Sequence, residues 1–163
     1  MQTIISFVGI ALFIIAAYGD VKSFRIPNVL VAAVALLAVV RLIVIGDPSV
    51  ALYTVGASAI VLAIGFVLFW RGVVGGGDAK LLTASALLIG YHDLFSFLVV
   101  MSICGALISL VALVTEWSRR STVVSSPDQP QPKATLYVPY GVAIATAGGV
   151  TLFFQIPLIS FIW

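Results

Sequence analysis

The stretch Gly75-Gly76-Gly77-Asp78-Ala79-Lys80 places an acid directly after three glycines and between two apolar segments, 52–70 and 81–91. A carboxylate is costly to remove from water, so an ionisable side chain at the edge of a hydrophobic span indicates a functional site. Glycine carries no side chain, so other groups can approach the backbone closely here. A second acid, Asp20, ends the first apolar run. The two acids are therefore candidates for one shared site.

The composition is that of an integral membrane protein. The 163 residues are 62% hydrophobic and only 9% charged, whereas a soluble domain carries about a quarter charged residues. The net charge of +2 is too small to suggest nucleic acid as a partner. The single cysteine, Cys104, can form neither an internal disulfide nor a cysteine zinc site by itself.

The apolar runs predict an all-α, polytopic fold with about six transmembrane helices in one membrane-embedded domain, 1–163. The runs cover 4–18, 29–45, 52–70, 81–91, 94–115 and 141–162. Two of them are short beside the roughly 20 residues that a span usually needs. The polar connection at about 116–138 is rich in proline and serine, so we expect a mobile loop there.

The basic residues predict the orientation of the helices. Seven of the eight fall in alternate connections: Lys22, Arg25, Arg71, Lys80, Arg119, Arg120 and Lys133. By the positive-inside rule these connections face the cytoplasm, so both termini lie outside and the two acids share the cytoplasmic side. Arg41 is the exception, and we expect it either to pair with Asp47 or to extend to the outer surface.

The depth of Asp78 can also be predicted from the sequence. A helix over 78–91 covers roughly 21 Å, against a hydrocarbon core of about 30 Å. We therefore expect Asp78 to lie several ångströms inside the membrane, where irregular backbone must line a wet cavity or be buried in protein.

Three motifs resemble one family. The first is D-x-K-x-x-x-I-P-N, formed by Asp20, Lys22, Ile26, Pro27 and Asn28. The second is G-x-G-D-x-K, formed by Gly75, Gly77, Asp78 and Lys80. The third is P-Y-G-x-A, which begins with Pro139, Tyr140 and Gly141. Their order resembles the type IV prepilin peptidases, membrane aspartic proteases of the G-x-G-D type, and in particular the small members that serve tight-adherence (Flp) pili.

The resemblance implies a prepilin as the substrate and a role in pilus biogenesis. The enzyme would remove the basic leader of the prepilin at the cytoplasmic face of the inner membrane, with Asp20 and Asp78 as the catalytic pair and the other motif residues in support. It implies no metal and no cofactor. The connection 19–28 is short and lacks the paired cysteines of the larger, methylating members, so we expect peptidase activity without methyl transfer.

Two acids suit peptide hydrolysis on chemical grounds as well. The reaction needs a base to activate water and an acid to protonate the leaving nitrogen. Two nearby carboxyl groups that share one proton supply both functions. The sequence does not say which acid is the base. The only histidine, His92, is predicted on the opposite side of the membrane.

Other interpretations of these residues remain open. Asp20 and Lys22 can form an ordinary interfacial ion pair, and Asp78 with Lys80 can form a polar turn. Lys22, Arg25 and Lys80 fit orientation anchors better than catalysts, and the segment 26–28 fits the start of a helix. At the level of function, the alternatives are a small proton-coupled transporter and a non-catalytic assembly factor of a membrane secretion machine.

Overall fold

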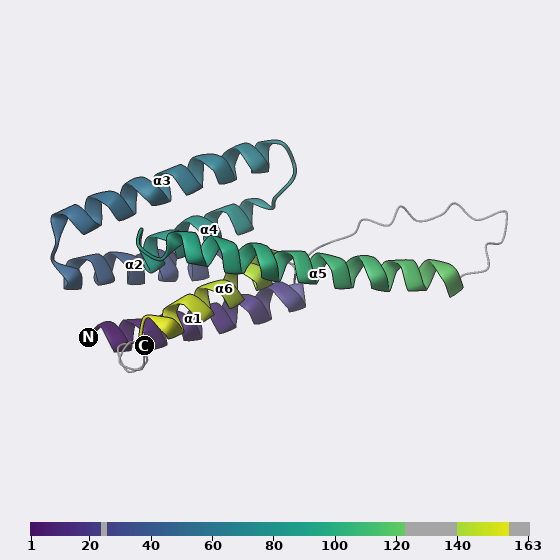
Figure 1. The fold of residues 1–163 in the computed structure, drawn as a ribbon, viewed down its shortest axis with the longest axis horizontal. Helices are drawn as coiled ribbons and strands as arrows, with labels where there is room; N and C mark the ends of the chain where they lie inside the picture. The colour runs from purple at the N-terminus through teal and green to yellow at the C-terminus, as the bar shows by residue number, and fades with distance from the viewer. Residues whose placement is uncertain (24–25, 123–139, 157–163) are drawn as a thin grey trace.

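The computed structural model describes residues 1–23, 26–122 and 140–156. In these ranges the regular structure is six α-helices and no strand, which confirms the predicted all-α fold (Figure 1). The helices are α1 (Gln2–Ser23), α2 (Asn28–Ile45), α3 (Pro48–Trp70), α4 (Gly76–Ile89), α5 (Leu94–Thr122) and α6 (Tyr140–Phe154).

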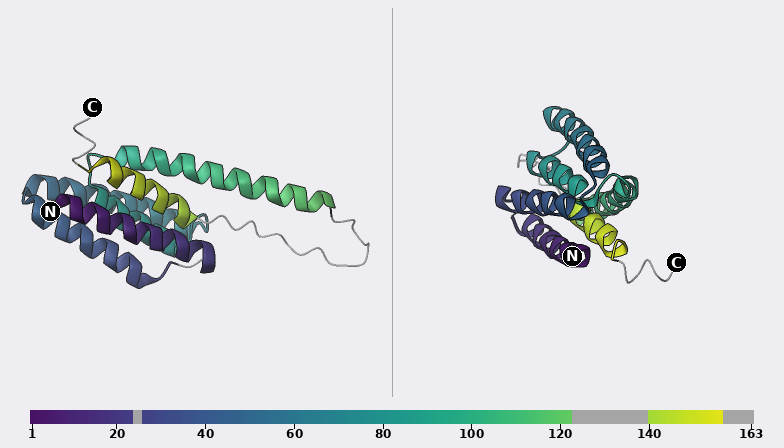
Figure 2. Two further views of the ribbon diagram at one scale, coloured as in Figure 1. Left: turned by 90° about the horizontal axis from the view of Figure 1, so that it is seen from below. Right: turned by 90° about the vertical axis from the view of Figure 1, so that its left-hand side faces the viewer.

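The two shortest helices, α4 and α6, form the centre of the bundle. They pack against each other, with α2 and α3 against α4, and α1 and α5 against α6. The end-on view in Figure 2 shows α4 among α2, α3 and α5, and α6 between α1 and α5. With 14 and 15 residues, each central helix is roughly 21–22 Å long. Both are therefore shorter than a hydrocarbon core of about 30 Å.

The core is filled by large apolar side chains from several helices. Phe13, Leu81, Leu88, Phe97 and Leu152 are each 1% exposed or less. The central helices also bury many small residues, which let neighbouring backbones approach closely. Close packing of the central pair fixes where the first turns of α4 and α6 lie.

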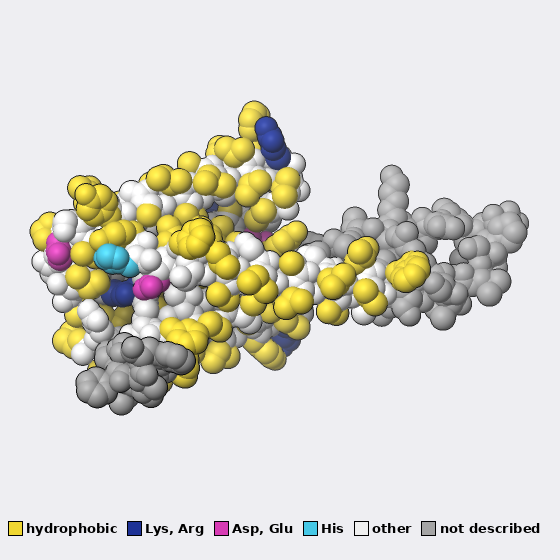
Figure 3. All heavy atoms as spheres, viewed as in Figure 1, with side chains coloured by type: hydrophobic (Ala, Val, Ile, Leu, Met, Phe, Trp, Pro, Cys, Tyr) yellow, Lys and Arg dark blue, Asp and Glu magenta, His cyan; other side chains and the backbone are white. Residues whose placement is uncertain are grey.

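The outer surface is apolar, as expected for a protein that spans a membrane. Four helices, α1, α2, α3 and α5, are long and apolar enough to cross a bilayer among the residues described. Figure 3 shows apolar side chains over the middle of the visible face and charged side chains toward its two ends. This arrangement confirms a polytopic membrane protein.

Several helix boundaries differ from those predicted from the apolar runs. Helix α1 continues to Ser23, so Asp20 and Lys22 lie on a helix rather than in a connection. Helix α5 continues to Thr122 and extends past the other helices (Figures 1 and 2). Part of the connection predicted at 116–138 is therefore helical, and its remainder lies outside the described residues. Polar side chains end an apolar run without ending the backbone hydrogen bonding of a helix.

Candidate active site

Asp20 and Asp78 lie at the same end of the bundle. Asp20 is in the last turns of α1 and is 3% exposed, while Asp78 is in the first turn of α4 and half-buried. The C-terminal end of α1 and the N-terminal ends of α4 and α6 meet there (Figure 1). Asp20 contributes to the electrostatic environment of Asp78. The structure therefore places both predicted acids at one end of the bundle.

Asp20 is bound by the first turn of α6. Its Oδ2 atom accepts a hydrogen bond from the backbone N–H of Val142 at 3.1 Å, and the backbone of Gly141 also hydrogen-bonds to its carboxyl group. The first N–H groups of a helix have no partner within the helix and favour a negatively charged acceptor. Asp20 thus caps a helix that begins 120 residues later in the chain.

Asp78 caps its own helix. Gly75 is the N-cap of α4, and its backbone hydrogen-bonds to the Asp78 carboxyl group. This is the reciprocal half of a capping box, in which an acid at the third helical position reaches back to the N-cap. A Cβ atom at Gly75 would lie only 2.9 Å from Oδ2 of Asp78. The glycine therefore makes room for the carboxyl group.

The segment 26–28 joins the two acidic motifs. Ile26 lies against Gly77, because a Cβ atom at Gly77 would be 3.6 Å from the Ile26 Cβ. Ile26 also lies against Gly141, because a Cβ atom there would be 3.0 Å from the Ile26 Cδ1. Pro27 is the N-cap of α2, as the helix-start interpretation predicted. Lys80 donates a hydrogen bond to Oδ1 of Asn28 at 3.5 Å. These contacts connect the ends of α2, α4 and α6 with the segment that follows α1.

The remaining predicted supporting residues are Lys22, Tyr140 and Pro139. Lys22 is exposed, and its Nζ lies 5.9 Å from the centre of the Tyr18 ring on the same helix. Tyr140 is 39% exposed at the start of α6. Pro139 lies outside the described residues.

The prediction that Arg41 pairs with Asp47 or extends to the surface is wrong. The Arg41 guanidinium is partly buried and donates hydrogen bonds to the carbonyl groups of Leu88 and Ile89, the latter at 2.7 Å, and to Gln155 Oε1 at 2.9 Å. It therefore satisfies the C-terminal carbonyl groups of α4, which have no partner inside the helix. Asp47 instead caps α3 and accepts from Ser49 N at 2.8 Å and Ser49 Oγ at 2.6 Å.

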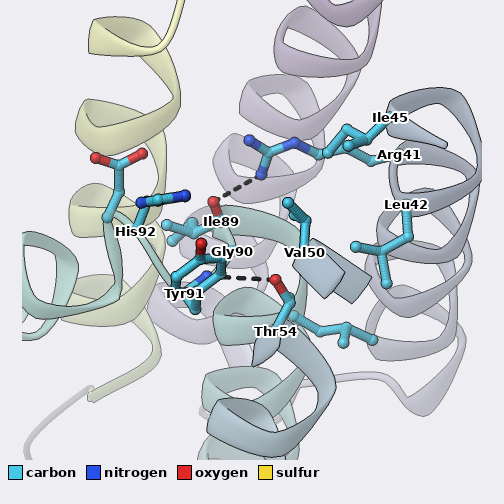
Figure 4. Close-up of a pocket in the computed structure, with 11 residues that line it drawn as sticks. Arg41, Leu42, Ile45, Val50, Thr54, Ile89, Gly90, Tyr91 and His92 are labelled. Atoms are coloured by element: carbon cyan, nitrogen blue, oxygen red, sulfur yellow. Dashed lines mark hydrogen bonds between the residues drawn. The ribbon is translucent and has the colours of Figure 1, made fainter. Parts of the chain in front are cut away.

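A pocket lies beside Arg41, at the opposite end from the acids. Its volume is about 100 Å³, and it is lined by residues of α2, α3, the last turn of α4 and the turn between α4 and α5. Figure 4 shows the Arg41 guanidinium directed at the Ile89 carbonyl group, and the Tyr91 N–H directed at the Thr54 hydroxyl group. Gln155 closes this cluster by donating to Asp93 Oδ2 at 2.5 Å and to Ile89 O at 3.0 Å. His92 also lines the pocket, so it lies away from the acids as expected.

Sequence reasoning did not identify Val142 or Gln155. Val142 takes part through its backbone N–H, which no side-chain pattern reports. The glycine before it, at the start of an apolar run, is the one signal of a close approach, but it does not indicate which acid approaches. Gln155 is a polar residue near the end of an apolar run, and its position in the sequence does not indicate a partner. Among the described residues, no three His, Cys, Asp or Glu side chains group as metal ligands.

The comparison with protein families agrees with this arrangement. A model of the type IV leader peptidase family matches residues 7–110, a range that contains both Asp20 and Asp78. No curated protein and no solved structure matches the chain. The family match covers most of the chain and confirms the resemblance carried by the motifs. The chain therefore belongs to the type IV leader peptidase family, and it is a membrane-spanning peptidase of that family.

Proposed function

We propose that this protein is an aspartic endopeptidase that removes the basic leader of prepilins at the cytoplasmic face of the inner membrane, as a step in pilus biogenesis. The observation that carries the proposal is the position of Asp20 and Asp78 at one end of the bundle in a chain of the type IV leader peptidase family. The positive-inside arrangement of the basic residues supports the cytoplasmic face as the side on which cleavage occurs.

The proposed reaction needs only water and the two carboxyl groups. The ionised carboxylate takes a proton from water as the water oxygen attacks the carbonyl carbon of the scissile peptide bond. The protonated carboxyl group then supplies a proton to the leaving nitrogen as the C–N bond breaks. One water is consumed, and the products are a carboxyl-terminated leader and a pilin with a free amino terminus. No redox step or co-reactant is needed.

The remaining motif residues have a supporting role in this proposal. Gly75 and Gly141 leave space for Asp78 and Asp20 respectively, whereas a Cβ atom at Gly77 would make only an ordinary contact with Ile26. Lys80 and Asn28 hold α4 near α2 through their hydrogen bond. Lys22 fits an orientation anchor, because it contacts Tyr18 rather than a residue of the pair.

We propose hydrolysis without methyl transfer. Helix α1 ends at Ser23 and α2 begins at Asn28. The intervening residues 24–27 are too few for the cysteine-containing region that the resemblance associates with the methylating members.

The proposal is tested by expressing the protein with a candidate prepilin in cells that lack their own leader peptidase. The size of the prepilin is followed for the wild type, Asp20→Asn and Asp78→Asn. We expect the wild type to shorten the substrate, and each Asn variant to leave it at full length while accumulating normally in the membrane. Asp47→Asn is the matched control, because Asp47 is exposed and lies at the start of α3, and it should cleave as the wild type does.

Each other outcome excludes a part of the proposal. Cleavage by either Asn variant would remove that acid from the mechanism. A wild type that cleaves no prepilin while pilus assembly still depends on the protein would favour the assembly factor. The mass of the mature pilin also reports methyl transfer, because a product heavier by one methyl group would contradict a peptidase without methyltransferase activity.

A further inference from the structure

The carboxyl group of Asp20 occupies a notch on α6 that exists because residue 141 has no side chain. A Cβ atom at Gly141 would lie 2.7 Å from Asp20 Oδ2 and 2.8 Å from its Cγ. Real Cβ atoms essentially never approach other atoms within 3.0 Å. The same Oδ2 accepts the Val142 N–H at 3.1 Å. The Oδ2 atom of Asp20 thus lies where a side chain at position 141 would be, and it also accepts a hydrogen bond from the first turn of α6.

The backbone at position 141 does not itself require glycine. The described glycines in the left-handed region are Gly46, Gly72 and Gly90, whereas Gly141 lies in the first turn of a right-handed helix. Alanine is the better helix former in that conformation. The steric demand at this position comes from the neighbours of Gly141, the Asp20 carboxyl group and Ile26 Cδ1.

We propose that Gly141 is a positioning residue of the reaction: it seats Asp20 Oδ2 on the first amides of α6, and so leaves Oδ1 as the oxygen that exchanges protons with water or substrate. The inference rests on the proposed function, because it gives Asp20 a part in proton transfer. A carboxylate oxygen that accepts amide hydrogens has fewer lone pairs available for a further proton. Holding Oδ2 in this way fixes both the place and the rotation of the reactive oxygen.

The main test is the kinetics of Gly141→Ala in purified enzyme with a prepilin substrate. To reach the ordinary contact distance of 3.4 Å, the new methyl group must displace the carboxyl group. A misplacement of about 1 Å in a reacting group can lower the rate by about 100-fold. We expect kcat to fall by roughly 10- to 100-fold with KM changed by less than about twofold, because the substrate-binding surface is left in place.

Two glycines of the same helix supply matched controls. Gly149 has open space around its Cβ position, whereas a Cβ at Gly148 would meet Phe13 at 2.5 Å and no group of the catalytic pair. Gly149→Ala should keep the wild-type kcat. Gly148→Ala should lower thermal stability but leave kcat per folded molecule near that of the wild type. Comparison of Gly141→Ala with these two controls distinguishes an effect of disturbed packing of α6 from an effect of displacing Asp20.

A second measurement does not depend on cleavage. The amide proton of Val142, recorded by NMR on labelled protein in detergent micelles, should be shifted downfield by its bond to a carboxylate. Asp20→Asn and Gly141→Ala should both move this resonance upfield, and Gly149→Ala should leave it in place. The spectrum reports on the hydrogen bond between Val142 and Asp20 whether or not the tested prepilin is a substrate.

The outcomes distinguish this inference from the proposed function. If the wild type cleaves and Gly141→Ala has the same kcat as Gly149→Ala, the positioning role is wrong while the peptidase assignment stands. An equal loss of kcat in Gly141→Ala and Gly148→Ala would also overturn it, because general packing would then explain the effect. If no prepilin is cleaved, the proposed function fails. An unmoved Val142 resonance in Gly141→Ala overturns the seating of Asp20 under either result.

Discussion

At the scale of single residues, charged side chains in this protein satisfy backbone groups at helix ends. Asp20 accepts from the first turn of α6, Asp78 accepts from the N-cap of α4, and Arg41 donates to the last carbonyl groups of α4. Inside a membrane, a helix end without such partners costs several kcal/mol for each unsatisfied group. The proposed catalytic acids thus also contribute to the structure, and Arg41 is the basic counterpart at the other end of α4.

The role of Arg41 leads to a stability prediction. Arg41→Leu removes the hydrogen bonds to two carbonyl groups and to Gln155, so we expect the free energy of unfolding to fall by about 3 kcal/mol, the range for leaving buried partners of a charge unsatisfied. Arg71→Leu is the control, because Arg71 is exposed after α3. Unfolding in mixed micelles with increasing SDS gives both values. A loss in Arg41→Leu no larger than in Arg71→Leu would contradict a capping role.

The same variant should retain its chemistry. Arg41 lines the pocket at the end opposite to the acids, so the kcat of the folded fraction of Arg41→Leu should stay within about threefold of the wild type, as expected for sites that share no partners. Leader cleavage measured on the fraction that remains folded checks this. A specific loss of kcat without unfolding would show that the two ends are coupled.

At the scale of helices, length and capping decide how each element is used. The long helices α1, α2, α3 and α5 can cross a bilayer, whereas α4 and α6 are shorter than the hydrocarbon core and lie between them. The first turn of α6 donates a hydrogen bond to Asp20, and the first turn of α4 contains Asp78. A short helix enclosed by longer ones is expected to end below the membrane surface, and the depth of Asp78 stays a prediction.

The cap of α3 gives a pH-dependent prediction at this scale. Hydrogen bonds from the hydroxyl group and backbone of Ser49, and from the backbone of Val50, lower the pKa of Asp47. A lowered pKa means that the cap stabilises the helix above the ordinary carboxyl pKa of about 4, and that this contribution is lost as the pH falls through the lowered value. We therefore expect slow hydrogen exchange at the amides of Ser49 and Val50 near neutral pH. Their protection should be reduced in Asp47→Ala.

Hydrogen exchange in the wild type is compared with exchange in Asp47→Ala and in Asp47→Asn. The protection of these two amides in the wild type should approach that of Asp47→Ala only in acid, and Asp47→Asn should remain partly protected throughout, because asparagine is also a good N-cap. Equal exchange in the wild type and Asp47→Ala near neutral pH would contradict the cap. Exchange is read by mass spectrometry after pH-matched labelling.

At the scale of the whole molecule, the bundle has two chemically different ends. One end holds the two acids with the motif residues of three segments, and the other holds the cluster of Arg41, Asp93 and Gln155. The basic residues that the positive-inside rule counts favour the acidic end as the cytoplasmic one. The orientation of the bundle determines which side of the membrane supplies the substrate.

The orientation is tested with single cysteines in a Cys104→Ser background. Val73 follows α3 on the side of the acids and is 57% exposed, and His92 is exposed in the turn after α4. An impermeant thiol reagent added to intact cells should label His92→Cys and should label Val73→Cys only after the membrane is opened. Labelling of Val73→Cys alone in intact cells would reverse the proposed orientation and place the acids outside.

Much of this protein was predictable from its sequence because its local signals agree with one another. The apolar runs gave six helices, and the spacing of Asp20, the segment 26–28 and the glycines before Asp78 indicated the family that the comparison confirmed. The catalytic roles of the two acids remain a prediction. The apolar run ends before the polar Asp20 and Lys22 and so predicts a connection there, whereas the helix continues to Ser23.

The sequence by itself determined that the chain is helical and membrane-spanning and that two acids stand beside glycines, since composition and motif spacing are local properties. Only the tertiary structure decided that α4 and α6 are central, that Asp20 rests on α6 at Gly141, and that Arg41 binds the end of α4 rather than Asp47. Membrane helices are apolar on every side, so their pattern marks no inward face. Which backbone ends need a charged partner depends on how the helices pack, and that information is spread over the whole chain.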